Sequence, residues 1–457
     1  MVQPIVSIIL TSYNKPNTIG NAIESVINQT RKDWELFIMD DASDDATLQI
    51  IKTYVDDERI TVINSNIDDD KRYMTTRYAT LINEAIPKTK GKYISYLTDD
   101  TTYISNRLEM MIQEMESNPT LDVVYSSQKV ITLDHDANVV SEKTRYTKGI
   151  LTNAANVVDH CSVMHTRKIA DSIYKRYDSY WDDDPIYWHN GDAAFWTRLN
   201  QFSSFYPINS ILDISYKSPY SFQNLNEYLP KELPDGVLVK GYLSDVYLIE
   251  NNMRRKIDEE FFPKLRFDKS RITEIPDPNL YKYKMGPNID QCIYDNPSLF
   301  PNGRLVSASN NNEIYYIQEH KKRLIFNQHA FDKYHFSMEE VIELEIDYLN
   351  QFEEGPIISN LLNNEGVILP NNILFTDSKR YFLSQNNYLH EIDKVVLNKL
   401  KIKEEWAVRM TNEERLCFPK GNSFQWTYYK SGGKKGRNRK KKISTGSIVY
   451  RNRKTRD

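Results

Sequence analysis

The feature that most constrains the fold is an alternation of short apolar runs with helical patterns over the first hundred residues. Apolar residues recur at helical spacing over residues 18–30, 46–55 and 75–86. Between these segments lie four strand-like runs, at residues 6–10, 35–39, 60–63 and 92–97. The alternation predicts a doubly wound α/β domain with a mainly parallel sheet, which binds ligands at the carboxyl ends of its strands.

Polar side chains gather where three of these predicted strands end. Residues 11–14 follow the first strand, Asp40 and Asp41 follow the second, and Asp99 and Asp100 follow the last. A sheet that is only a scaffold has no need for paired acids at two strand ends. The pattern therefore indicates a binding site along this edge of the sheet.

Each of these motifs has a chemical and a structural interpretation. An aromatic ring and hydroxyls at residues 11–15 could hold a planar base, and Asp41 could accept hydrogen bonds from a base or a ribose. Asp99 and Asp100 suit a hard cation such as Mg²⁺ or Mn²⁺, which would neutralise charge on a departing diphosphate. Taken singly, the motifs also fit a strand-to-helix turn, a helix cap and a solvated acidic turn.

A fourth motif, residues 189–196, opens a predicted helix with an acid near its start. Asp192 could be the general base that deprotonates an acceptor hydroxyl, or it could cap the helix. Indole rings stack well on the C–H faces of sugars, so Trp181 or Trp188 could line an acceptor site. Core packing is expected for Trp196, which lies inside the helical pattern.

In their order and combination these motifs resemble family 2 glycosyltransferases, whose nucleotide-sugar-binding α/β fold is called GT-A. Over residues 3–222 the chain looks like the spore coat polysaccharide biosynthesis glycosyltransferases of bacilli. The matching blocks are residues 10–15, 35–41, 76–79, 98–100, 159–165, 179–182 and 191–192.

The resemblance implies a nucleotide site in which Thr11 and Tyr13 flank a uracil or thymine ring and Asp41 is hydrogen-bonded to that ring. Two arginines would lie near the base or the phosphates. The nucleotide-binding residues implied in this way are Thr11, Ser12, Tyr13, Asp41, Arg72, Arg77 and Asp99.

The same resemblance implies an inverting, single-displacement transfer with Asp192 as the base. Asp100 would bind Mn²⁺ or Mg²⁺ between the diphosphate oxygens, with Asp99 in the ribose or metal shell. The family's usual Asp-X-Asp motif is Thr98-Asp99-Asp100 here, which leaves one firm ligand and predicts a weakly held metal. His160 lies between the donor and base motifs, and it could contact a sugar or be a buried structural histidine.

Prolines at positions 230 and 234 mark a boundary, so the GT-A domain is predicted for residues 1–230. Beyond it the sequence repeats, with the copies anchored on Tyr247, Tyr315 and Tyr381. A β-hairpin is expected around residues 250–252, and a helical stretch at residues 337–343, with Ser337 as its N-cap. The three copies span about residues 236–290, 303–358 and 366–422.

These copies look like small β-hairpin modules appended to some bacterial surface and cell-wall proteins. They contain no convergent set of acids or histidines. Residues 236–429 are therefore interpreted as a scaffold or interaction module.

Charge separates residues 430–457 from the rest of the chain. They contain twelve Lys or Arg and one acid, so residues 1–429 carry −15 in a chain of net charge −4. We expect a disordered basic tail that either contacts an anionic polymer or a membrane surface, or has no partner. The acidic body disfavours nucleic acid, and no specific nucleic-acid partner is expected.

No run approaches the about 18 apolar residues of a membrane-spanning helix, and no signal peptide is recognisable. Three cysteines, Cys161, Cys292 and Cys417, are too far apart to suggest a disulfide framework or a zinc cluster. The expected location is the cytoplasm, including the periphery of the membrane or of the forming spore surface.

Together these features predict an enzyme that moves a sugar from a UDP- or dTDP-sugar to a surface or spore-coat polysaccharide or glycoprotein. One alternative is a catalytically silent GT-A domain that binds or assembles partners through its repeats and tail. The presence of Asp41, Asp100 and Asp192 argues against silence. A sugar nucleotidyltransferase would need a Gly-rich phosphate loop after the first strand, and residues 11–14 contain no glycine.

Overall fold

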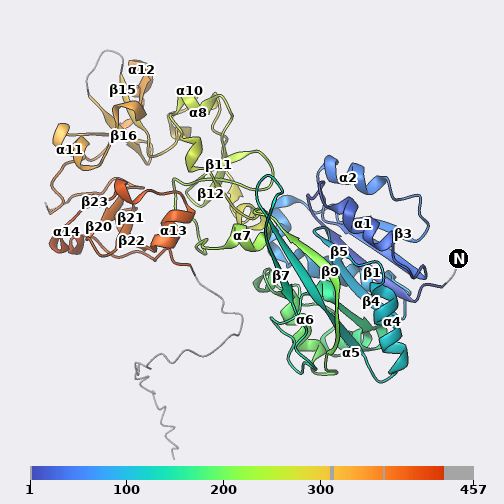
Figure 1. Cartoon of the computed structure of the whole chain (residues 1–457). Helices are drawn as coiled ribbons and strands as arrows, with labels where there is room; N and C mark the ends of the chain where they lie inside the picture. The colour runs from blue at the N-terminus through green and yellow to red at the C-terminus, as the bar shows by residue number, and fades with distance from the viewer. Residues whose placement is uncertain (1–2, 309–312, 364–365, 427–457) are drawn as a thin grey trace, which may run out of the picture. The chain divides into compact units, whose positions relative to one another are not determined.

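The computed structural model describes residues 3–308, 313–363 and 366–426 (Figure 1). These described residues belong to one compact unit, and within them a nine-stranded sheet in the N-terminal part is followed by three smaller sheets. The predicted basic tail, residues 430–457, lies outside the described residues. Within the described ranges, no helix is long and apolar enough to cross a membrane.

The nine-stranded sheet has a parallel half and a mixed half. Strands β3, β2, β1 and β4 lie side by side and are parallel, as the alternation of strands and helices predicts. Beyond β4 the order is β8, β6, β9 and β5, where only the β6–β9 pair is parallel, and β7 pairs with β6. The strands are β1 (Val6–Ser12), β2 (Trp34–Asp40), β3 (Ile60–Asn64), β4 (Tyr93–Thr98), β5 (Thr101–Tyr103), β6 (Val123–Leu133), β7 (Val139–Arg145), β8 (Val163–Thr166) and β9 (Tyr206–Lys217).

Helices cover both faces of this sheet, because successive side chains of a strand point to opposite faces and all of β1 is buried. Ile8 and Leu10 pack with α1 and α4, whereas Ile9 packs with α3, α5 and α6. The helices are α1 (Ile19–Ile27), α2 (Asp45–Lys52), α3 (Arg77–Ala85), α4 (Arg107–Ser117), α5 (Arg167–Tyr177), α6 (Gly191–Leu199) and α7 (Phe222–Asn226).

The aromatic core on the α6 side of the sheet contains Trp181, for which the sequence suggested an acceptor site. Its side chain is fully buried and stacks on Phe195, with ring centroids 4.5 Å apart. The indole N–H donates to the Tyr96 hydroxyl at 3.3 Å, so its polar atom has an internal partner. The acceptor-site prediction for Trp181 is therefore wrong, whereas Trp196 is buried as expected.

Three smaller sheets follow, one in each of the segments 238–285, 305–354 and 374–409. In each of the first two, three antiparallel strands are flanked by a short parallel strand on either side. In the third, β20, β21 and β22 are antiparallel and β23 is parallel to β20. The strands are β10 (Leu238–Lys240), β11 (Val246–Glu250), β12 (Met253–Lys256), β13 (Thr273–Glu274), β14 (Lys284–Met285), β15 (Leu305–Ala308), β16 (Tyr315–Gln318), β17 (Lys321–Leu324), β18 (Val341–Leu344), β19 (Glu353–Glu354), β20 (Leu374–Thr376), β21 (Tyr381–Gln385), β22 (Tyr388–Ile392) and β23 (Val408–Arg409).

The hairpin predicted at residues 250–252 is confirmed, because β11 and β12 pair with Glu250 opposite Met253. Its two turn residues, Asn251 and Asn252, have φ of 52° and 58°, the left-handed backbone that tight hairpin turns require and asparagine tolerates. The helical stretch predicted at residues 337–343 is shorter than expected. Ser337 caps a single 3₁₀ turn, Met338–Glu340, and the chain then enters β18, which pairs with β15.

Each pair of these three units shares an apolar core. One cluster joins the first and second units, another joins the first and third, and another joins the second and third. Every unit therefore stabilises both of the others. Their helices are α8 (Phe261–Lys264), α9 (Asp277–Tyr281), α10 (Cys292–Asp295), α11 (Gln328–Lys333), α12 (Ile346–Leu349), α13 (Lys394–Lys399) and α14 (Asn412–Leu416).

Replacement of Trp181 by alanine tests its assignment to the core. We expect the free energy of unfolding to fall by about 3–5 kcal/mol, because a fully packed indole leaves a cavity. Urea denaturation followed by circular dichroism measures the change, and Trp188→Ala, at a partly exposed indole, should lose clearly less. A Trp181→Ala protein of unchanged stability would contradict the assignment.

Candidate active site

The register of three parallel strands brings the predicted motifs to one edge of the sheet. Ser12 lies opposite Asp40, and Thr11 lies opposite Thr98, so β1, β2 and β4 end side by side. The residues that follow these strands line one cavity of about 360 Å³.

The cavity gathers every site residue predicted from the sequence except Trp181. They arrive from strand ends, from the segment around α3, from the 3₁₀ turn His160–Ser162 and from α6, so distant parts of the sequence converge. Their proximity leaves the individual roles as predictions. The residues are Thr11, Ser12, Tyr13, Asp41, Arg72, Arg77, Asp99, Asp100, His160, Trp188 and Asp192.

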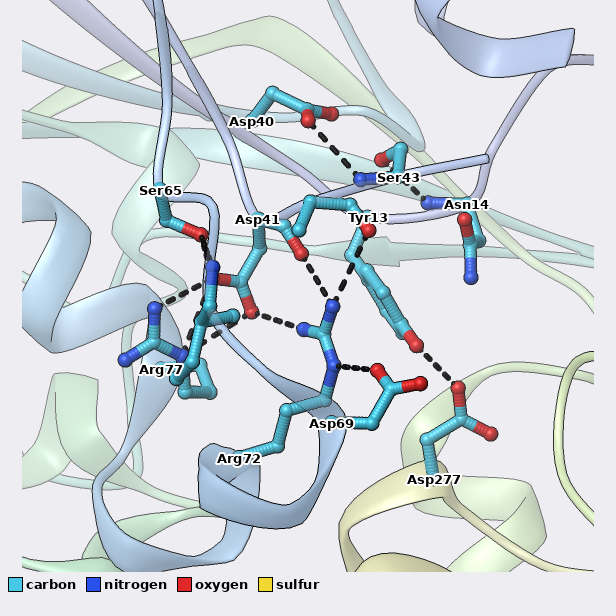
Figure 2. Close-up of polar contacts among 12 residues, drawn as sticks. Tyr13, Asn14, Asp40, Asp41, Ser43, Ser65, Asp69, Arg72, Arg77 and Asp277 are labelled. Carbon is cyan, nitrogen blue, oxygen red and sulfur yellow. Dashed lines mark hydrogen bonds and ion pairs between the residues drawn. The ribbon is translucent and has the colours of Figure 1, made fainter. Parts of the chain in front are cut away.

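Asp41 is the buried centre of one end of the cavity (Figure 2). Only 4% of it is exposed, and its carboxylate accepts hydrogen bonds from Arg72 at 2.7 Å and from Arg77 at 2.6 Å. The hydroxyl of Ser65 donates to the same group at 3.1 Å. Arg72, which is 2% exposed, also pairs with Asp69 at 2.8 Å. Arg77 therefore depends on the Asp41 charge, and Arg72 depends on it together with Asp69, because a buried charge without a partner is strongly unfavourable.

This network refines the contacts that the resemblance implied for Asp41 and the arginines. The carboxylate of Asp41 is occupied by two guanidinium groups rather than held open toward a base. The guanidinium carbon of Arg72 lies 4.1 Å from the centroid of the Tyr13 ring, so Asp41 holds Arg72 against that tyrosine. Arg77 keeps 15% of its side chain exposed, and it is the arginine of this pair with more surface for a phosphate.

Asp99 and Asp100 lie next to each other in different environments. Asp99 is buried and accepts the backbone N–H of Tyr13 at 2.8 Å. Burial, together with the charge of Asp100, raises the pKa of Asp99 to about 7. Asp100 accepts the Thr98 hydroxyl at 2.7 Å and faces the ammonium of Lys217 across 3.8 Å. Two crowded carboxyl groups in a cavity are a donor set that fits a hard divalent cation.

Lys217 is a site residue that sequence reasoning missed. It is the last residue of β9, lines the cavity, and keeps 21% of its side chain exposed. The charges of Asp100 and then Asp159 raise its pKa, so it stays protonated. The signal in the sequence was one basic residue after the mixed polar and apolar segment 208–216, in a strand whose existence depends on long-range pairing.

A second group of metal-ligand types, Asp159, His160 and Cys161, lies beside these acids. Burial acts to raise the pKa of Asp159, but the charges of His160, Lys217 and Arg145 outweigh it and hold that pKa well below the usual range. Burial also raises the pKa of the Cys161 thiol. An acid already neutralised by cations and a protonated thiol suit a hard cation poorly, so the acids after β4 are the better candidates.

Asp192 occupies the first turn of α6 and lines the cavity. The cap of that helix is Asn190, so the capping interpretation does not describe Asp192, whose carboxylate accepts the N–H of Ala193 at 2.8 Å. Burial raises the pKa of Asp192; the charge of His160 opposes this shift. A raised pKa brings the carboxylate nearer to the pH at which a general base works best.

Two further cavity residues remain candidates for sugar contacts. His160 is stacked on Tyr78 with ring centroids 6.0 Å apart. Trp188 packs edge-on to Phe222 at 5.8 Å. Both rings are partly exposed and line the cavity, so a sugar could reach them.

Residues after position 230 also line the cavity, which sequence reasoning did not anticipate. They are Tyr242 and the segment 275–278, and they belong to the first of the three small units. A faint signal existed in the repeat. The first unit has Asp277-Pro278-Asn279 where α12 of the second unit begins with Ile346-Asp347-Tyr348.

Comparison with known proteins adds a family to this geometry. Residues 7–172 match the family described as Glycosyl transferase family 2. Protein CgeD of Bacillus subtilis (strain 168) is 40% identical over 428 residues, which cover 93% of this chain and 96% of that protein. The UDP-Glc:alpha-D-GlcNAc-diphosphoundecaprenol beta-1,3-glucosyltransferase WfgD of Escherichia coli is 32% identical over 131 residues, 28% of this chain and 47% of that protein.

Among solved structures, S. aureus TarS 1-349 in complex with UDP is similar to this chain with a TM-score of 0.36 and 14% identity. The match covers 48% of this chain and 63% of that one, and we draw no conclusion from so low a score.

The α/β sheet, its cavity and these matches define the protein as a glycosyltransferase with a GT-A-type fold. The chain belongs to family 2 of the glycosyltransferases.

Removal of the Asp41 carboxylate tests how much the site depends on it. Asp41→Ala leaves Arg77 without its ion-pair partner and buried Arg72 with only the half-exposed Asp69, and we expect a loss of about 3–5 kcal/mol in the free energy of unfolding. Asp57→Ala is the matched control, because Asp57 pairs with Arg59 at 2.6 Å near the surface and should lose at most about 1 kcal/mol. Urea denaturation compares the two, and equal losses would show that the buried pairing is not special.

Proposed function

We propose that this glycosyltransferase moves a sugar from a UDP- or dTDP-sugar to a carbohydrate or glycoprotein acceptor, with inversion at the sugar carbon. The observation that carries the proposal is the convergence in one cavity of an aromatic and arginine cluster, an acid pair and a separate acid on α6. A nucleotide, a diphosphate and an acceptor hydroxyl each require one of these groups.

The nucleotide donor binds at the end of the cavity around Asp41. Thr11 and Tyr13 flank the pyrimidine base, while Asp41 holds Arg72 in place over the tyrosine ring. Arg77 is available to the phosphates. The name of the E. coli relative includes a UDP-sugar donor, which supports a uridine nucleotide over a purine nucleotide here.

The acids after β4 and Lys217 interact with the leaving diphosphate. Asp100, with Asp99 beside it, would hold Mn²⁺ or Mg²⁺, and a bound divalent ion neutralises charge on the departing diphosphate. Lys217 places a second positive charge beside these acids, with its ammonium 3.8 Å from the Asp100 carboxylate.

Asp192 accepts the proton of the acceptor hydroxyl. As that proton leaves, the acceptor oxygen forms a bond to the sugar carbon, and the bond from this carbon to the diphosphate breaks on the opposite side. One such displacement inverts the configuration of the carbon. The remaining region, residues 236–429, acts in this proposal as an accessory region, and the basic residues 430–457 contact an anionic polymer or a membrane surface.

A thermal-shift screen of nucleotide sugars with and without Mn²⁺ tests the proposed function. A ligand that binds the native state raises the unfolding midpoint, so UDP- or dTDP-sugars should raise it, and GDP- and ADP-sugars should raise it less. A screen in which no pyrimidine nucleotide sugar shifts the midpoint would overturn the proposal.

Asp192→Asn should lower the transfer rate at least about a hundredfold and leave the donor KM nearly unchanged, because only proton removal is lost. In the unmodified protein the rate should fall as the pH drops through the raised pKa of Asp192, since protonation disables the base. A steady-state pH profile measures both effects. Asp45→Asn, at an exposed acid in the first turn of α2, is the control and should retain full activity. Full activity in Asp192→Asn would rule out the assignment.

Asp100→Asn tests the metal. Calorimetric titration of the unmodified protein with UDP should show tighter binding with Mn²⁺ than with EDTA, because the ion links the carboxylate to the diphosphate. Asp100→Asn should lose this difference and keep its affinity for UDP in EDTA. The metal role would be wrong if Mn²⁺ left the UDP affinity of the unmodified protein unchanged.

A further inference from the structure

Part of the cavity lining comes from the first accessory unit. Tyr242 and residues 275–278 line the same cavity as Tyr13 and Asp99. Helix α9, which begins at Asp277, packs beside the 3₁₀ helix Asp69–Met74 that carries Arg72. The accessory region therefore reaches the part of the cavity where the base is proposed to bind.

Asp277 connects the accessory unit to the catalytic sheet (Figure 2). It is 4% exposed, and its carboxylate accepts the backbone N–H of Tyr242 at 2.7 Å and the hydroxyl of Tyr13 in a short hydrogen bond. The chain passes so close at Gly241 that a Cβ there would lie 2.1 Å from a carboxylate oxygen of Asp277. The fit of this carboxylate between Gly241 and Tyr13 fixes where the tyrosine hydroxyl lies.

Tyr13 is consequently held at three points. Asp99 accepts its backbone N–H, Arg72 lies over one face of its ring, and Asp277 accepts its hydroxyl proton. A base that stacks on the ring would use the face that Arg72 leaves. The angle and depth of that face then depend on the hydrogen bond from the hydroxyl to Asp277.

The corresponding helices of the other two units lack this feature. Their first residues are Ile346 and Asn412, and none of the acids in their first turns, Asp347, Glu413 and Glu414, is buried. The buried acid is therefore particular to the unit beside the cavity, which a general requirement of the repeat would not explain.

We propose that Asp277 is a positioning residue for nucleotide binding, which orients Tyr13 through its hydroxyl, so that the accessory region completes the donor site. This inference rests on the proposed pyrimidine-nucleotide site. It assigns residues 236–429 a direct part in donor binding in addition to any part in acceptor recognition.

Calorimetric titration of the full chain with UDP and with dTDP, in the presence of Mn²⁺, tests the inference. Asp277→Ala should weaken binding about tenfold or more, because a buried hydrogen bond to a charged group is lost. Tyr13→Phe should weaken binding by a similar factor, since it removes the same bond from the other side. The matched control is Asp347→Ala, at the exposed acid of the second unit, which should bind as the unmodified protein does.

The double variant Tyr13→Phe with Asp277→Ala distinguishes orientation of Tyr13 from a general loss of structure. If Asp277 acts through the Tyr13 hydroxyl, the double variant should bind the nucleotide no more weakly than the single variant with the lower affinity. A loss of affinity in the double variant equal to the product of the two single losses would overturn the inference. Asp277→Asn, which retains hydrogen-bonding atoms at both contacts, should recover most of the affinity, and it preserves the test if Asp277→Ala does not fold.

The outcomes of these titrations distinguish failure of the proposed function from failure of the inference about Asp277. If the unmodified chain binds neither UDP nor dTDP, the proposed function fails and this inference fails with it. If the unmodified chain binds and folded Asp277→Ala and Tyr13→Phe bind equally well, the proposed function stands and the inference is wrong.

Discussion

Burial of two guanidinium groups at one end of a protein cavity is favourable only where anions pair with them, and the most buried of those anions is Asp41. Arg72 and Arg77 converge on its carboxylate, and Arg72 in turn covers a face of Tyr13. The arrangement of the cavity follows from this pairing. The segment that carries Arg72 is anchored to the end of β2, and the tyrosine after β1 gains a rigid neighbour. An ordered aromatic and cationic surface therefore exists before any ligand arrives.

The same chain of contacts continues beyond the catalytic sheet, because Tyr13 is hydrogen-bonded to Asp277 in the first small unit. Since each pair of units shares a core, that contact joins the cavity to the whole of residues 236–426. The chain therefore does not divide simply into an enzyme and an appendage. A truncation after residue 230 would remove part of the cavity lining together with the repeats, and its effects would not isolate a separate function of the repeats.

The parts of the fold that were predictable are those specified by local sequence pattern. Alternating apolar runs identified β1 to β4, and the polar residues after them marked the edge where the cavity lies, because parallel strands of one sheet end together. The mixed half of the sheet depends on pairing between distant segments, so β9 and its terminal Lys217 were missed. Trp181 was misjudged because its burial depends on packing against Phe195 of α6, which the local sequence pattern does not show. Asp277 was missed because its partner lies 264 positions away.

A crystal structure of the chain with UDP and Mn²⁺ would locate the base and the diphosphate in the cavity. We expect a uracil ring against Thr11 and Tyr13, with Arg72 still paired to Asp41, and a diphosphate beside Asp100 and Lys217. A uracil bound elsewhere, or a diphosphate turned away from the acids after β4, would contradict this expectation.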